Sequence, residues 1–135
     1  MKKTLYIDCD GVIIPSNEYT TELIDICVEN FNCIWISDRE IEITDGELDY
    51  IEDFKMFLSA GDIEKLYQID PNPKKNRLKS ERLDLNLDFY WLDDAPVHED
   101  LVFLEKNQLL NRLIILKSWR PETTKKAIEK LKNLI

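Results

Sequence analysis

The chain has 135 residues, of which 44% are hydrophobic, and it carries a formal net charge of −9. This length and composition are typical of a single globular domain over residues 1–135, and the acidic balance argues against general nucleic-acid binding. No run reaches the ~20 apolar residues of a membrane span, and the apolar stretch after the basic N-terminus is too short for a signal peptide. Three cysteines without Cys-x-x-Cys spacing indicate neither a disulfide framework nor a zinc site, which favours a cytoplasmic location.

Short apolar runs alternate along the chain with segments of helical spacing, which predicts strands alternating with helices. In chain order the predicted elements are strand 5–7, helix 20–31, strand 33–36, helix 47–58, a helical turn at 63–66, helix 74–83, strand 89–92, strand 113–116 and helix 121–134. Such alternation is typical of βαβ units. We therefore expect an α/β fold with a mostly parallel sheet that is covered on both faces.

The most informative stretch follows the first predicted strand. Asp8 and Asp10 stand one residue apart there, and Gly11 comes directly after them. Ligand sites of open α/β sheets form at the carboxyl ends of strands, so these acids are candidates for a site. Two neighbouring carboxylates repel each other unless a proton or a cation relieves them, and Mg²⁺ prefers oxygen ligands. The alternative is a simple turn, since Asp and Gly both favour turns.

Polar residues also follow the next two predicted strands. Ser37 follows strand 33–36, and the pair Asp93 and Asp94 follows strand 89–92. In a parallel sheet these strand ends lie side by side, which would gather carboxylates and a hydroxyl at one edge. Phosphoryl transfer uses such a set, with one carboxylate as nucleophile, another as acid and base, and a metal ion and hydrogen-bond donors around the phosphate.

Basic residues could complete such a site. The segments 74–82 and 117–132 are rich in lysine and arginine. Such charge runs are usually solvated surfaces, and the functional alternative is that they border an anionic substrate. Arg39, close behind Ser37, is a candidate for phosphate binding, for which a surface ion pair with a nearby acid is the alternative.

Together these motifs resemble those of the haloacid dehalogenase (HAD) superfamily of phosphohydrolases, and most closely the small HAD domains associated with RNA-repair proteins. The resemblance rests on Asp8-Cys9-Asp10-Gly11-Val12, Trp35-Ile36-Ser37, a lysine of the first basic segment and Trp91-Leu92-Asp93-Asp94, which occur in the family's order. It implies a three-layer Rossmann-like HAD fold. The segments that follow the first two motifs are too short for a full cap domain, so we expect a minimal cap or none, and an open site.

The resemblance also implies a role for each motif residue. Asp8 would be the nucleophile of a phosphatase that forms an aspartyl-phosphate, and Asp10 would be its general acid and base. Ser37 would hydrogen-bond the phosphoryl group. The implied cofactor is Mg²⁺, and its implied ligands are Asp8, Asp10 through its backbone carbonyl, Asp93 and Asp94.

The lysine of this site is open between three residues. Lys74 and Lys75 fit the start of the predicted helix after Pro73, whereas Lys79 falls in its middle. We prefer Lys75 as the catalytic lysine and keep Lys74 as a second residue that binds the substrate.

The favoured function is Mg²⁺-dependent hydrolysis of a phosphomonoester, and the candidate substrates are a nucleotide, a nucleic-acid end or a small phosphate ester. One alternative is a receiver-like phosphoacceptor domain, in which Lys117 would be the lysine near the last strand. Another is a non-catalytic HAD-like binding module that uses the basic segments for a partner. Asp8, Asp10 and Asp93 argue against the binding module, because acids held close without a metal are costly.

Overall fold

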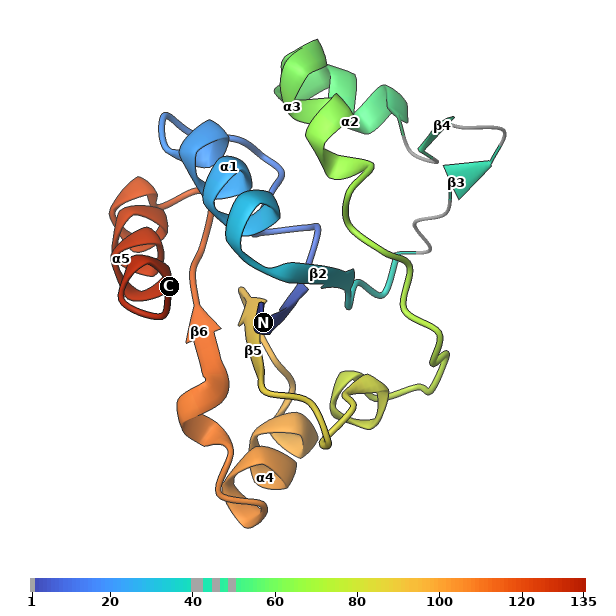
Figure 1. The fold of residues 1–135 in the computed structure, drawn as a ribbon, viewed down its shortest axis with the longest axis vertical. Coiled ribbons are helices and arrows are strands. Elements are labelled where there is room, and N and C mark those ends of the chain that lie inside the picture. The colour runs from blue at the N-terminus through green and yellow to red at the C-terminus, as the bar shows by residue number, and fades with distance from the viewer. Residues whose placement is uncertain (1, 40–42, 45–46, 49–50) are drawn as a thin grey trace.

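A four-stranded parallel sheet forms the centre of the protein in the computed structural model, which describes residues 2–39, 43–44, 47–48 and 51–135 (Figure 1). The spatial order of the strands is β2 (Asn32–Trp35), β1 (Thr4–Ile7), β5 (Phe89–Asp93) and β6 (Leu113–Ile115), and all neighbours run parallel. The two middle strands, β1 and β5, therefore end side by side, with Ile7 opposite Leu92. The structure is α/β and compatible with a Rossmann-like fold.

Helices cover both faces of this sheet, because successive residues of a strand point to opposite faces. Leu5 and Ile7 of β1 pack in the larger core, under α1 (Thr20–Asn30) and α5 (Pro121–Lys132). Tyr6 faces the other way, into a smaller core with Trp91 and with Leu104 of α4 (His98–Lys106). Burial on both faces explains why the strands read as continuous apolar runs rather than as alternating patterns.

The segment after β2 adds a small unit above the sheet. It contains the two-residue strands β3 (Ile43–Thr44) and β4 (Glu47–Leu48), which pair antiparallel, and the helices α2 (Ile51–Phe57) and α3 (Ala60–Leu66). Hydrogen bonds connect it to the loop before α1 and to α1 itself. Ser16 Oγ donates to the carbonyl of Phe57 at 2.6 Å, and Thr21 Oγ1 donates to Asp62 Oδ2 at 2.8 Å.

Most of the predicted elements are confirmed. All four strands, α1 and α5 lie where the sequence placed them, and α5 begins with a proline at its first position, as such helices often do. The helical turn predicted at 63–66 is the end of the longer α3. Within the part of the chain that is described, no helix is long and apolar enough to cross a membrane.

Two predicted helices differ from the structure, and one helix was not predicted. Helix 74–83 is wrong, since only the short 3-10 helix η1 (Lys79–Arg82) forms within it. The helix predicted at 47–58 begins only at Ile51, because residues 47–48 form β4, and positions 49–50 lie outside the described residues. Helix α4 was not predicted, and Asp100 and Leu104 are its buried positions.

Candidate active site

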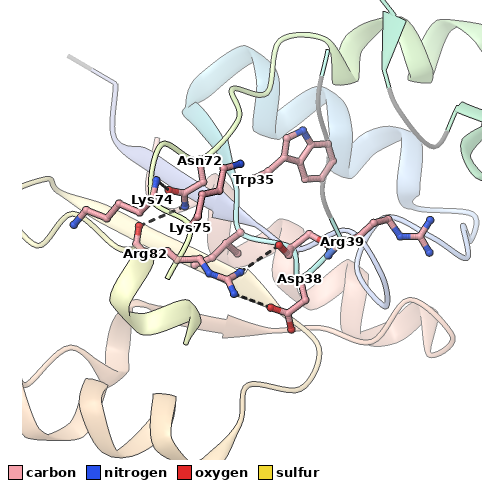
Figure 2. A pocket seen from close by; sticks show the side chains of 9 residues that line it. Trp35, Asp38, Arg39, Asn72, Lys74, Lys75 and Arg82 are labelled. Atoms are coloured by element: carbon pink, nitrogen blue, oxygen red, sulfur yellow. Dashed lines mark hydrogen bonds and ion pairs between the residues drawn. The ribbon is translucent and has the colours of Figure 1, made fainter. Parts of the chain in front are cut away.

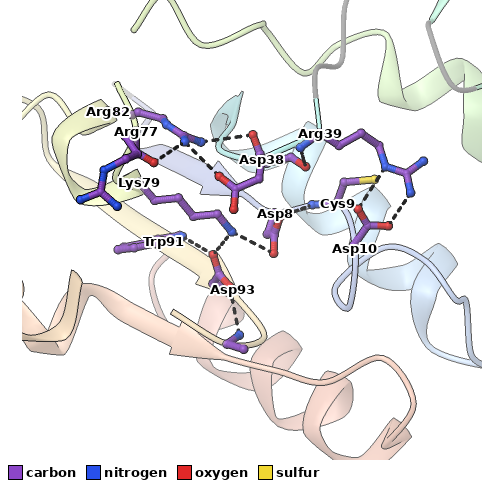
Figure 3. A network of polar contacts seen from close by, with 12 residues as sticks. Asp8, Cys9, Asp10, Asp38, Arg39, Arg77, Lys79, Arg82, Trp91 and Asp93 are labelled. Atoms are coloured by element: carbon purple, nitrogen blue, oxygen red, sulfur yellow. Dashed lines mark hydrogen bonds and ion pairs between the residues drawn. The ribbon is translucent and has the colours of Figure 1, made fainter. Parts of the chain in front are cut away.

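Acidic side chains from two strands meet at the carboxyl edge of the sheet. Carboxylate oxygens of Asp8, Asp93 and Asp94 lie within 4.8 Å of one another. Asp8 follows β1 and Asp93 ends β5, so the parallel pairing of the two strands brings the acids together. Figure 3 shows Asp8 and Asp93 converging on Lys79, with the pair of Asp10 and Arg39 to one side. We call Asp8, Asp93 and Asp94 the acid cluster.

Asp93 is the most firmly held member of the acid cluster. Its side chain is fully buried, and its Oδ2 accepts hydrogen bonds from Lys79 Nζ at 2.8 Å and from the indole N–H of Trp91 at 3.1 Å. Its Oδ1 accepts the backbone N–H of Ala95 at 3.0 Å. Three donors around one buried carboxylate fix its orientation and compensate its lost hydration.

The lysine at the acid cluster is Lys79, and not the preferred Lys75. Lys79 Nζ lies 3.2 Å from Asp8 and 2.8 Å from Asp93, and its side chain is only 12% exposed. Lys75 is exposed and contacts neither acid in the described part of the chain. The preference for Lys75 depended on a helix that does not form, since η1 begins only at Lys79 and so presents this residue to the site.

The surroundings of the Asp8 carboxyl disfavour its ionised form. The pKa of its carboxyl is raised from 3.8 to about 8, mainly by burial and next by the charge of Asp93. A hydrogen bond with Asp94 adds to this rise, and Lys79 opposes it. Burial would also lower the pKa of Lys79, but the facing carboxylates of Asp8 and Asp93 outweigh it and raise that pKa. The one ammonium, that of Lys79, thus pairs with two of the three carboxyl groups of the acid cluster.

Gly11 makes room for Asp94. Its backbone φ is +82°, a value that residues other than glycine rarely adopt. A Cβ at this position would lie 2.2 Å from a carboxylate oxygen of Asp94. The turn after Asp10 is also held from the far end of the chain. Ser118 N–H donates to the carbonyl of Gly11 at 2.8 Å, and the Asn17 side chain donates to the carbonyl of Ser118 at 2.9 Å.

Asp10 lies outside the acid cluster. Its two carboxylate oxygens accept hydrogen bonds from Arg39 Nε and Nη2, each at 3.0 Å. Arg39 also forms an ion pair with Asp53 of α2 and therefore links the β1 turn to the helical unit. The sequence did not indicate a role for Asp53, because its contact with Arg39 depends on how the segment after β2 folds.

Ser37 opens a second, basic part of the site. Together with Arg39, Lys74 and Lys75 it lines a pocket of about 150 Å³ at the end of β2 (Figure 2). Arg82 of η1 holds this wall in place. Its Nη1 donates to the carbonyl of Ser37 at 3.2 Å, and its Nη2 donates to Asp38 at 2.9 Å. The sequence placed Arg82 only within a basic segment and gave it no role.

The cluster suits a hard divalent cation. Three carboxyl groups offer oxygen ligands around one point, and burial and the charge of Asp93 raise the pKa of Asp8. Mg²⁺ is bound in proteins through one or two carboxylates and the phosphate oxygens of its substrate, which agrees with this donor set. The fit concerns Asp8, Asp93 and Asp94, whereas the Asp10 carboxylate is directed to Arg39.

The geometry is one of a parallel α/β sheet with acids, a lysine and a basic pocket at its carboxyl edge. Comparison of the chain with family models, with characterised proteins and with solved structures finds no match. The residues of the site therefore carry the functional argument.

Proposed function

We propose that the protein is an HAD-type, Mg²⁺-dependent phosphatase that hydrolyses phosphomonoesters through an aspartyl-phosphate on Asp8. The observation that supports this most is the acid cluster with Lys79 between Asp8 and Asp93, at the edge where α/β folds bind ligands. A surface turn would leave such acids in water, whereas here Asp8 and Asp93 are buried.

In the proposed reaction a carboxylate oxygen of Asp8 attacks phosphorus, and the bond between phosphorus and the ester oxygen breaks. Asp10, which takes up a proton from solvent once its pair with Arg39 opens, gives this proton to the leaving oxygen. Water then attacks the phosphorus and gives a proton to Asp10, while the bond between phosphorus and Asp8 breaks. Phosphate leaves, and Asp8 returns to its carboxylate form. Mg²⁺ held by Asp8, Asp93 and Asp94 would supply positive charge beside the phosphoryl oxygens.

Other residues position the phosphate in this scheme. The Lys79 ammonium is close enough to Asp8 to bind an equatorial oxygen of a phosphate attacked there, and Ser37 lies at the same edge of the sheet, just after β2. Asp10 reaches the leaving oxygen only when its pair with Arg39 opens. The Asp10 side chain is 55% exposed and that of Arg39 is 25% exposed, so the pair lies at the border with solvent.

The test is hydrolysis of p-nitrophenyl phosphate by the full chain. We expect turnover with Mg²⁺, none with EDTA, and a loss of about 10³-fold or more in kcat for Asp8→Asn, because the nucleophile is removed. Asp88→Asn is the matched control, since Asp88 lies at the opposite end of β5 in an exposed pair with Arg112.

Two outcomes would contradict the proposal. Undiminished activity of Asp8→Asn would exclude Asp8 as the nucleophile. A protein that takes up phosphate from acetyl phosphate and keeps it, without turnover, would be a phosphoacceptor rather than a phosphatase.

A further inference from the structure

The basic pocket beside Ser37 has a charge opposite to that of the whole protein. The chain carries a net charge of −9, yet the pocket is lined by four basic side chains and one carboxylate. These charged residues are Arg39, Lys74, Lys75, Arg82 and Asp38. Arg39 is paired with Asp10 and Asp53, and Arg82 with Asp38, so the excess positive charge comes from the two lysines. Such a local excess in an acidic protein attracts an anion.

The pocket and the acid cluster share two walls. The first wall is η1, which directs Lys79 to Asp8 and Arg82 to the carbonyl of Ser37. The second wall is the end of β2, where Ile36 N–H donates to the carbonyl of Ile7, directly before Asp8, at 3.0 Å. A ligand that places one group at Asp8 can therefore extend into the pocket.

The basic side chains of the pocket differ in how many of their hydrogen-bond donors already have a partner. Arg82 is occupied by Asp38 and by three backbone carbonyls, those of Ser37, Asn76 and Arg77, so its role is to shape the wall. Lys74 Nζ donates one hydrogen bond, to the carbonyl of Leu83 at 3.1 Å, and an ammonium has three donors. Lys75 is exposed and makes no hydrogen bond or ion pair in the part of the chain that is described. These two lysines remain available to an anion.

A neighbouring cavity of about 210 Å³ is less suited to an anion. Its charged lining, which includes Lys79, has more acids than bases. The acids are Asp38, Glu99 and Asp100, and the bases are Arg77 and Lys79. On the basis of charge, a second anionic group therefore fits the pocket beside Ser37 better than the neighbouring cavity.

We propose that this pocket binds a second phosphate of the substrate, next to the phosphate that is attacked at Asp8. The inference rests on the proposed function and narrows it to phosphomonoesters with a further phosphate. Two sources share this chemistry, namely a nucleoside bisphosphate and a short oligonucleotide with a phosphorylated end. Lys74 and Lys75 form charge-assisted hydrogen bonds to the second phosphate.

The experiment measures binding without turnover. In the Asp8→Asn protein, isothermal titration calorimetry compares adenosine 5′-monophosphate, adenosine 3′,5′-bisphosphate and a 5′-phosphorylated dinucleotide. We expect one or both ligands with a second phosphate to bind about tenfold or more tightly than the monophosphate. Their ranking distinguishes the two sources of the second phosphate.

Charge reversal locates the binding site. Lys75→Glu in the same background should abolish the preference for a second phosphate, whereas Lys126→Glu, the same change at an exposed position of α5, should keep it. Lys75 is exposed, so circular dichroism and the melting temperature should confirm that the variant folds. Equal affinities for one and two phosphates, or a preference that Lys75→Glu leaves intact, would overturn the inference.

These results separate the two proposals. An active phosphatase without a preference for a second phosphate would leave the proposed function standing and remove the inference. A preference that depends on Lys75, in a wild-type protein without phosphatase activity, would leave a bisphosphate-binding site and remove the proposed reaction.

Discussion

Replacing Asp8 by Asn should stabilise the metal-free protein, and increasingly so as the pH rises. The pKa of Asp8 is raised to about 8, from 3.8, first by burial and then by Asp93. Between these two values the unfolded chain has lost the proton and the folded chain keeps it, so the free energy of unfolding falls as the pH rises. Each pH unit in this window costs about 1.4 kcal/mol. Asn does not titrate, so from pH 5 to pH 7 the stability of Asp8→Asn relative to wild type should rise by about 3 kcal/mol.

Urea unfolding in EDTA at pH 5 and pH 7 measures this difference, with the fluorescence of the buried Trp35 and Trp91 as the probe. Asp88→Asn, which changes an exposed carboxylate in the same way, should follow wild type to within about 1 kcal/mol. Added Mg²⁺ should close the gap between Asp8→Asn and wild type, because a bound cation stabilises the ionised Asp8. A gap that is the same at both pH values would show that Asp8 is already ionised without a cation, and the electrostatic argument would fail.

Three further predictions concern the same edge of the sheet. Gly11→Ala should cost about 1–3 kcal/mol in urea unfolding and weaken Mg²⁺ binding, because the new Cβ displaces Asp94 from a position 2.2 Å away; unchanged Mg²⁺ affinity would refute this. Lys79→Met should cost about 3 kcal/mol near pH 7, since it removes the cation between two buried acids, and a loss below about 1 kcal/mol would contradict the pairing. Titration calorimetry of Mg²⁺ in buffers of different ionisation heat should show proton release near pH 7, because metal binding requires the ionised form of Asp8; binding without proton release would contradict its raised pKa.

The strands and the acid cluster could be predicted from the sequence because both depend on short-range patterns. A strand such as β1 is buried on both faces, so its apolar run is continuous, and the acids that follow β1 and β5 meet because neighbouring parallel strands end at one edge. That Asp8, Asp93 and Asp94 gather was therefore foreseeable, whereas their catalytic use stays a prediction.

The position of the lysine could not be predicted in the same way. Segment 74–83 contains charged residues with helical spacing, but its backbone carbonyls are bound from the side by Arg82, which donates to Asn76 at 2.6 Å and to Arg77 at 2.9 Å. A side chain that binds backbone carbonyls competes with helix formation. The spacing of apolar and charged residues in the sequence does not reveal such a contact. For the same reason the link from Arg39 to Asp53 depends on tertiary structure alone.

The hydrogen bond from Ser118 to Gly11 joins the turn of the first strand to a residue that is synthesised more than a hundred positions later. Asn17 extends this connection to Thr124 Oγ1, at 3.0 Å in α5. A ribosome delivers the chain from its N-terminus, so the turn that carries Asp8 and Asp10 emerges long before its anchors. These contacts can therefore form only after Ser118 and α5 have been synthesised. A chain that ends before Ser118 would lack the hydrogen bonds that hold the turn after β1.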